Sequence, residues 1–207
     1  LKILFQPAEE TLWGARRVLE TGAIDDVDIA YGLHVRPIQD IPAGTMCAAV
    51  RHTSSTLLKI EVTGRGAHGS RPHLGVNCAE AAALITNAIC AIKLNPAMVW
   101  SCKVTGIVAA AAATNIIPDK GTLTLDVRAQ TNELMQELIG KVRMAAEGAA
   151  ASIGAKAELV QETDPIPAAV YDEDLVEELR EIIATGKGQK RAKAVKRLKV
   201  VDAFTKS

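Results

Sequence analysis

The chain has 207 residues, of which 48% are hydrophobic and 23% are charged, and its formal net charge at pH 7 is zero. This length can bury the core of one large domain or two small ones, and the composition is typical of globular rather than disordered chains. No apolar run is long enough to cross a bilayer and no signal-peptide pattern is seen, so we expect a cytoplasmic protein with no membrane partner.

The zero net charge hides an uneven distribution. Residues 1–186 hold 16 Lys or Arg and 23 Asp or Glu, whereas residues 187–199 hold seven basic residues and no acidic one. Such a basic segment produces a local field that attracts nucleic acids or anionic surfaces. Because no aromatic residue lies among these bases, we expect a solvated end of the chain and no nucleic-acid partner.

The first segment has the pattern of an α/β domain. We expect a short apolar strand over residues 1–5 and a second strand over 27–35. Between them, residues 7–22 are predicted to form a helix that has Pro7 in its first turn and ends at Gly22. Strand, helix and strand in this order are typical of α/β domains. Because the chain starts inside the first strand with no initiator methionine, we expect it to be a fragment of a longer protein.

A Pro- and Gly-containing turn region separates this segment from a second pattern. Strands are predicted over 56–64, 98–109, 121–129 and 155–162, and helices over 77–93 and 132–154. The order βαββαβ is that of the ferredoxin-like fold, in which two helices cover one face of a four-stranded antiparallel sheet. A further helix over 172–185 has an apolar stripe that we expect to pack on the first segment.

Two adjacent carboxylates, Glu9 and Glu10, follow the first apolar run, and His34 lies near the end of the second. Neighbouring residues point in different directions, so one carboxylate can bind a metal ion while the other acts on a water molecule. Acidic residues also favour the first turn of a helix without any function, and a single histidine is often only a hydrogen-bonded structural residue. The residues alone leave both interpretations open.

A second group of polar residues belongs to the ferredoxin-like pattern. The glycine-rich segment 64–77 holds His68 and His73 in a predicted turn, for which a flexible connector without function is the simpler alternative. Asn115 precedes the third strand of this pattern, and Arg128 lies near the end of that strand. Amide and guanidinium groups are suited to hold a substrate carbonyl or carboxylate, so both residues are candidates for substrate binding.

Five segments of the sequence carry a resemblance to a known family. FQPAEE, GLHV, GRGAHGSRPHLGVN, NIIPD and DVR follow one another in this order with a βαββαβ insert, and together they resemble the M20 family of metallo-amidohydrolases. The most similar branch is the group of aminoacylases, hippurate hydrolases and auxin-conjugate hydrolases. The separations of 24 positions from Glu10 to His34 and of 13 from Asn115 to Arg128 also fit this family. The resemblance covers residues 1–186.

The resemblance implies a metal site in the first segment. Glu9 is similar to the general base that deprotonates a metal-bound water, and Glu10 and His34 are similar to metal ligands. The implied cofactors are two divalent ions per complete site, of zinc, manganese, cobalt or nickel.

The resemblance also implies that the ferredoxin-like part contributes to catalysis. His68 resembles a residue that reaches into the partner subunit's site and stabilises the tetrahedral oxyanion, which makes a homodimer part of the mechanism. Asn115 and Arg128 resemble groups that hold the substrate, an N-acyl amino acid or a related conjugate. His73 is interpreted as a turn residue.

The fold class implied by the resemblance is α/β, with part of a zinc-peptidase-like catalytic domain and an inserted ferredoxin-like lid or dimerisation domain. Residues 1–52 are expected to form the partial catalytic domain and residues 53–166 the lid. Residues 167–207 are expected to return to the catalytic domain and to end in the basic tail.

Two parts of the family pattern do not occur in this sequence. An upstream segment like H-x-C-G-H-D-x-H, and a later one like S-E-D-F followed by a final histidine, supply further metal ligands in the family, and Glu10 and His34 alone cannot hold two ions. We therefore expect an incomplete amidohydrolase that is inactive alone. The alternative is a non-catalytic dimerisation or interaction module derived from such an enzyme, and bound metal would distinguish the two.

Overall fold

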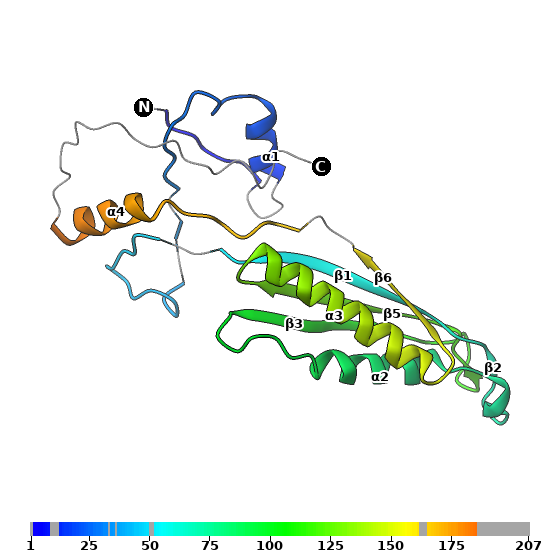
Figure 1. Ribbon diagram of the computed structural model, residues 1–207. Coiled ribbons are helices and arrows are strands. Elements are labelled where there is room, and N and C mark those ends of the chain that lie inside the picture. Colours follow the sequence, from blue (N-terminus) through cyan, green and yellow to red (C-terminus); the bar gives the residue numbers. More distant parts are fainter. Residues whose placement is uncertain are drawn as a thin grey trace. The chain divides into compact units, whose positions relative to one another are not determined.

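The computed structural model describes residues 2–8, 13–32, 34–35, 37–49, 52–161 and 165–185. The chain divides into two compact units, and each is described by itself (Figure 1). The first unit consists of Leu1–Val50 with Val170–Ser207, and the second unit is Arg51–Ala169. None of the described helices is long and apolar enough to cross a membrane.

A four-stranded antiparallel sheet forms the second unit, in the order β3, β5, β1, β6. Its strands are β1 (Ser54–Thr63), β3 (Trp100–Val108), β5 (Lys120–Ala129) and β6 (Lys156–Gln161). Helix α2 (Cys78–Cys90) lies between β1 and β3 in the chain, and α3 (Asn132–Ala151) lies between β5 and β6. This order and pairing are those of the ferredoxin-like fold, so the predicted βαββαβ arrangement is confirmed.

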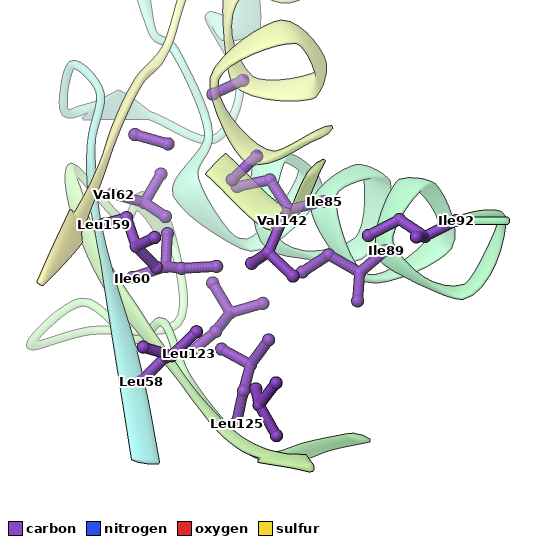
Figure 2. Packing of buried hydrophobic residues seen from close by; sticks show 14 of the residues in the cluster. Leu58, Ile60, Val62, Ile85, Ile89, Ile92, Leu123, Leu125, Val142 and Leu159 are labelled. Atoms are coloured by element: carbon purple, nitrogen blue, oxygen red, sulfur yellow. The ribbon is translucent and has the colours of Figure 1, made fainter. Parts of the chain in front are cut away.

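The core of the second unit lies between one face of the sheet and helices α2 and α3 (Figure 2). Alternate residues of β1 and β5 are buried because successive strand side chains point to opposite faces. Their inward side chains meet those of the helices in one cluster, which includes Leu58, Ile60, Val62, Ile85, Ile89, Leu123, Leu125 and Val142. The open face of the sheet carries the more exposed residues, among them Asp126 and Arg128 of β5.

The two helices begin and end where the sequence provides capping groups. The Asn77 side chain accepts a hydrogen bond from the Ala79 N–H at 2.9 Å, and Thr131 Oγ accepts one from the Leu134 N–H at 3.2 Å. Both contacts satisfy amide groups that the first turn of a helix leaves unpaired. The chain leaves α3 through Gly154, whose φ of +81° is a left-handed conformation that favours glycine.

The two ends of the second unit are held together by backbone hydrogen bonds. Ser55 and Ile166 form an antiparallel bridge, with N–H to carbonyl distances of 3.1 and 2.9 Å. Next to it, the Ala169 N–H donates to the His52 carbonyl at 3.1 Å. We call this short pairing the neck, because the chain enters and leaves the unit through it.

The first unit contains helices α1 (Trp13–Glu20) and α4 (Glu173–Thr185). The first helix ends at Glu20, two residues before the predicted stop at Gly22, which follows it with a φ of +65°. The part of the predicted helix over residues 9–12 lies outside the described residues. Partial desolvation, and then the carboxylates of Glu178 and Asp172, raise the pKa of Tyr31 above its usual value.

The two strands expected in the first unit are not formed in its described residues, and those predictions are wrong there. Residues 2–6, and the described residues between 27 and 35, adopt no strand conformation. The side chains of Phe5 and Val35 are each 89% exposed. A strand persists only where a neighbour satisfies its backbone hydrogen bonds, and no described segment provides that pairing here.

Candidate functional site

A small two-stranded sheet at one end of the second unit brings His68 and Asn115 together. Strand β2 (Ala67–His68) pairs antiparallel with β4 (Ile116–Ile117), and the Gly69 N–H donates to the Asn115 carbonyl at 2.7 Å. Figure 1 shows β2 beyond the end of β1. The sequence did not predict these strands, because two residues carry too little periodic pattern to be recognised.

The glycine-rich segment turns tightly, as predicted, and Gly64 permits the close approach of its two sides. A Cβ atom at Gly64 would lie 2.2 Å from the carbonyl oxygen of Val76. Beside this contact, Arg65 and Val76 form an antiparallel bridge. The Gly64 N–H donates to the Asp119 carbonyl at 2.8 Å, which ties the turn to the chain just before β5.

The His68 ring has polar groups at both of its nitrogens. Asn115 Nδ2 lies 3.3 Å from Nε2. On the opposite side, Ser70 Oγ lies 2.8 Å from Nδ1, and the Ser70 N–H donates to Nδ1 at 3.2 Å. All three residues are exposed. His73 is also exposed, and it lies in a single 3₁₀ turn (Pro72–Leu74), as a turn residue. An imidazole and an amide that meet at an exposed point can together bind an oxygen atom.

An open groove of about 620 Å³ lies next to this pair. Residues 109–118 line it from one side, and the opposite wall includes Pro72, Asn77 and Glu80 near the start of α2. Most of residues 109–118 are alanine or another apolar residue, so the groove offers small apolar surfaces beside the Asn115 amide. Such a lining suits the uncharged part of a ligand whose polar group binds at Asn115.

Arg128 lies at the far end of β5 in the four-stranded sheet, whereas His68 and Asn115 lie at the two-stranded sheet. Asn115 comes just before β4 and β5 begins at Lys120, whereas Arg128 is the penultimate residue of β5. At a rise of ~3.4 Å per residue, the eight steps from Lys120 to Arg128 span about 27 Å. The structure therefore brings His68 and Asn115 together and leaves Arg128 far from both within one protomer.

Asp126 holds the Arg128 side chain on the open face of the sheet. Arg128 Nε donates to both carboxylate oxygens of Asp126, at 3.3 and 3.2 Å. Among the described residues, the two terminal Nη groups of Arg128 have no acceptor. The motifs did not single out Asp126 or Ser70. For Asp126 the signal was its spacing, because it lies two positions from Arg128 in one strand, and this spacing places two side chains on one face. Ser70 lies in a turn, where spacing gives no such signal.

The structure does not test the proposed metal site. Glu9 and Glu10 lie outside the described residues. His34 is exposed in a segment without strand conformation, and its Nδ1 lies 2.6 Å from the carbonyl oxygen of Val35. In the part of the chain that the structure describes, no three His, Cys, Asp or Glu side chains gather closely enough to hold a metal ion.

The geometry of the second unit agrees with its relationship to known proteins. Residues 50–153 match the peptidase dimerisation domain of the M20 family. The chain belongs to the M20 peptidase family. The family that the five motifs indicated is thus confirmed.

Individual relatives share both sequence and architecture with the M20 chain. It is 34% identical over 161 residues to an indole-3-acetyl-aspartic acid hydrolase of Enterobacter agglomerans, covering 77% of this chain and 36% of that one. It is 36% identical over 149 residues to a hippurate hydrolase of Campylobacter jejuni, covering 69% and 39%. A crystal structure of a dinuclear metal-binding M20 peptidase from Bacillus subtilis is similar with a TM-score of 0.69 and 28% identity, covering 87% and 45%.

The M20 chain thus spans less than half of the length of each of these three proteins. The likeness in architecture confirms the predicted α/β fold class with a ferredoxin-like dimerisation lid.

Proposed function

We propose that the whole protein is a metal-dependent amidohydrolase that cleaves the amide bond of N-acyl amino acids or related conjugates. The names of its relatives support this proposal, because hippurate, N-acetylcysteine and indole-3-acetyl-aspartic acid are each an amino acid with an acylated nitrogen. The Bacillus subtilis peptidase is described as dinuclear, which supports two divalent ions per complete site. Zinc, manganese, cobalt and nickel are the candidate ions, and each polarises a bound water or carbonyl.

Three residues of the first unit take the proposed roles at that centre. Glu9 is the general base, which takes a proton from the attacking water and later gives it to the leaving amine. Glu10 and His34 are metal ligands. This chain alone is proposed to be inactive, because Glu10 and His34 by themselves cannot hold two ions.

Three residues of the second unit are proposed to bind the substrate. Arg128 offers its terminal guanidinium nitrogens to the substrate carboxylate, because Asp126 already occupies its Nε. His68 and Asn115 hold the oxygen of the scissile carbonyl, and they stabilise it as it becomes an oxyanion. An N-acyl amino acid carries this oxygen and its carboxylate only a few bonds apart.

The distance between these residues carries the proposal that two protomers build each site. Within one protomer, the His68–Asn115 pair lies near the start of β5, and from Lys120 at that start to Arg128 the strand extends about 27 Å. A small substrate cannot contact both ends of this strand. In this proposal one protomer supplies His68 and Asn115 to a site, and its partner supplies Arg128. A two-fold dimer therefore has two such sites, each built from both protomers.

The free edge of β3 is the proposed dimer contact. Of the two edge strands, β6 carries Lys156 and Glu158 within six residues, and charges of this kind protect an edge from pairing. In contrast, β3 has one charged residue in nine and exposes Ile107 by 51% and Val108 by 67%. An apolar edge with unpaired backbone groups is suited to pair with a second copy of itself.

Subunit mixing tests the proposal directly. Residues 51–169 would replace the dimerisation domain of the Campylobacter jejuni hippurate hydrolase, and the chimera should hydrolyse hippurate with added metal. His68→Ala and Arg128→Ala should each lower kcat/KM by ~10²–10³. In an equal mixture of the two variants, half of the dimers are mixed and one of their two sites is intact, so about a quarter of the activity should return.

The matched control is a mixture of His68→Ala with Asn115→Ala. Both residues come from the same protomer in this proposal, so no site in the mixed dimer is intact and no activity should return. Absence of recovery in the first mixture, when native mass spectrometry shows mixed dimers, would refute the shared site. A chimera that binds metal but leaves hippurate intact would instead contradict the amidohydrolase function.

A further inference from the structure

The His68 ring nitrogens are not equivalent, and the difference decides what the ring can do. The Ser70 N–H donates to Nδ1 at 3.2 Å, so Nδ1 is an acceptor in this contact and carries no proton. A neutral imidazole has one N–H, which must then be on Nε2. Nε2 is also the nitrogen that lies 3.3 Å from the Asn115 amide.

The Ser70 hydroxyl reinforces this arrangement. Its oxygen lies 2.8 Å from Nδ1, and a hydroxyl can turn its hydrogen toward an unprotonated ring nitrogen. The turn that carries Ser70 is fixed by its backbone, because the Arg71 N–H donates to the His68 carbonyl at 2.8 Å. The serine therefore approaches the ring in a defined geometry.

We propose that Ser70 is a positioning residue, which holds His68 in the tautomer that has its proton on Nε2. In this form Nε2–H and the Asn115 amide are both donors, and although they lie 3.3 Å apart they cannot satisfy each other. An oxygen acceptor within reach of both accepts from both. The other tautomer presents an unprotonated Nε2 and repels an oxyanion. The role of the two donors toward a substrate oxygen rests on the proposed function, whereas the tautomer of His68 does not.

Nuclear magnetic resonance of the ring nitrogens tests this proposal without any turnover. The full chain, labelled with ¹⁵N-histidine, would be measured at pH 8, where an ordinary imidazole with a pKa of ~6.5 is neutral. Ring nitrogen shifts distinguish protonated from unprotonated nitrogens, and His68→Gln identifies the His68 signals among the four histidines. We expect the wild-type His68 to have its proton on Nε2.

Ser70→Ala should shift the tautomer ratio of His68 toward Nδ1–H by about five-fold, the effect of one ordinary hydrogen bond. Ser70→Thr, which keeps the hydroxyl, should restore the wild-type ratio. Ser101→Ala in β3 is the matched control, because it removes a serine hydroxyl at the other end of the sheet, and it should leave the ratio unchanged.

Two results would overturn the proposal. A proton on Nδ1 in the wild-type chain would show that Nδ1 is not the acceptor of the Ser70 N–H. This measurement does not depend on the folding of any variant. An unchanged ratio in Ser70→Ala would show that the hydroxyl has no positioning role. Either result would leave the subunit-mixing test untouched, so failure of this inference is distinct from failure of the proposed function.

Discussion

Replacing Gly64 with alanine should destabilise the second unit by ~2–4 kcal/mol. The added Cβ atom would lie 2.2 Å from the Val76 carbonyl oxygen and 3.0 Å from Cys78 Sγ, and the backbone oxygen cannot turn away. Forcing one methyl group into a packed site costs ~1–3 kcal/mol. The displacement also strains the hydrogen bond from the Arg65 N–H to Val76, 3.0 Å long, and losing it costs about 1 kcal/mol more.

Urea unfolding monitored by tryptophan fluorescence would measure this change. A Trp13→Phe background leaves Trp100 as the single tryptophan, and Trp100 packs against the core of the second unit. Gly140→Ala is the matched control, because it adds the same methyl group on an exposed part of α3 with nothing within 4 Å. It should stabilise the helix by up to ~1 kcal/mol. If Gly64→Ala unfolds at the same or a higher urea concentration than the wild type, the steric argument is wrong.

Three further predictions concern activity, assembly and thiol chemistry. The chain alone should not hydrolyse N-acyl amino acids with zinc, manganese, cobalt or nickel, and turnover that requires metal and is lost in His34→Ala would contradict this. Ile107→Lys should raise the dissociation constant of the dimer, measured by light scattering, at least tenfold. Val160→Lys on the β6 edge should leave it unchanged, and equal effects of the two variants would exclude the β3 contact. Burial, then the neighbouring Cys90, raises the pKa of Cys102 from 9.0 to about 11. At pH 8 the Cys102 thiolate is therefore ~100-fold less abundant than it would be with a pKa of 9.0. Iodoacetamide should label the exposed Cys90 before Cys102, and equal labelling rates would refute the shift.

The second unit could be predicted from the sequence because each of its elements finds its partners within the chain. In β1 the alternation of Leu58, Ile60 and Val62 with polar residues matches one buried face, and β5 and β6 complete the pairing. Asn77 and Thr131 likewise mark the starts of the two helices by local chemistry. Local patterns suffice where the tertiary structure agrees with them.

The candidate site was only partly predictable for physical reasons. The motifs singled out His68, Asn115 and Arg128, but sequence spacing contains no information on which of them meet. That depends on the pairing of β2 with β4 and on the length of β5. The strand predicted over 27–35 is not formed in its described residues for a different reason. An apolar pattern indicates a buried strand, but a strand also needs neighbouring strands to pair with.

The neck of the second unit has a mechanical consequence. A force that separates His52 from Ala169 acts across the antiparallel pairing, and it therefore loads the hydrogen bonds of the neck one after another rather than all at once. Each broken bond costs only about 1 kcal/mol, whereas shearing a whole strand would require many to break together. The neck can thus open by single steps at low force, while the paired strands behind it keep their register.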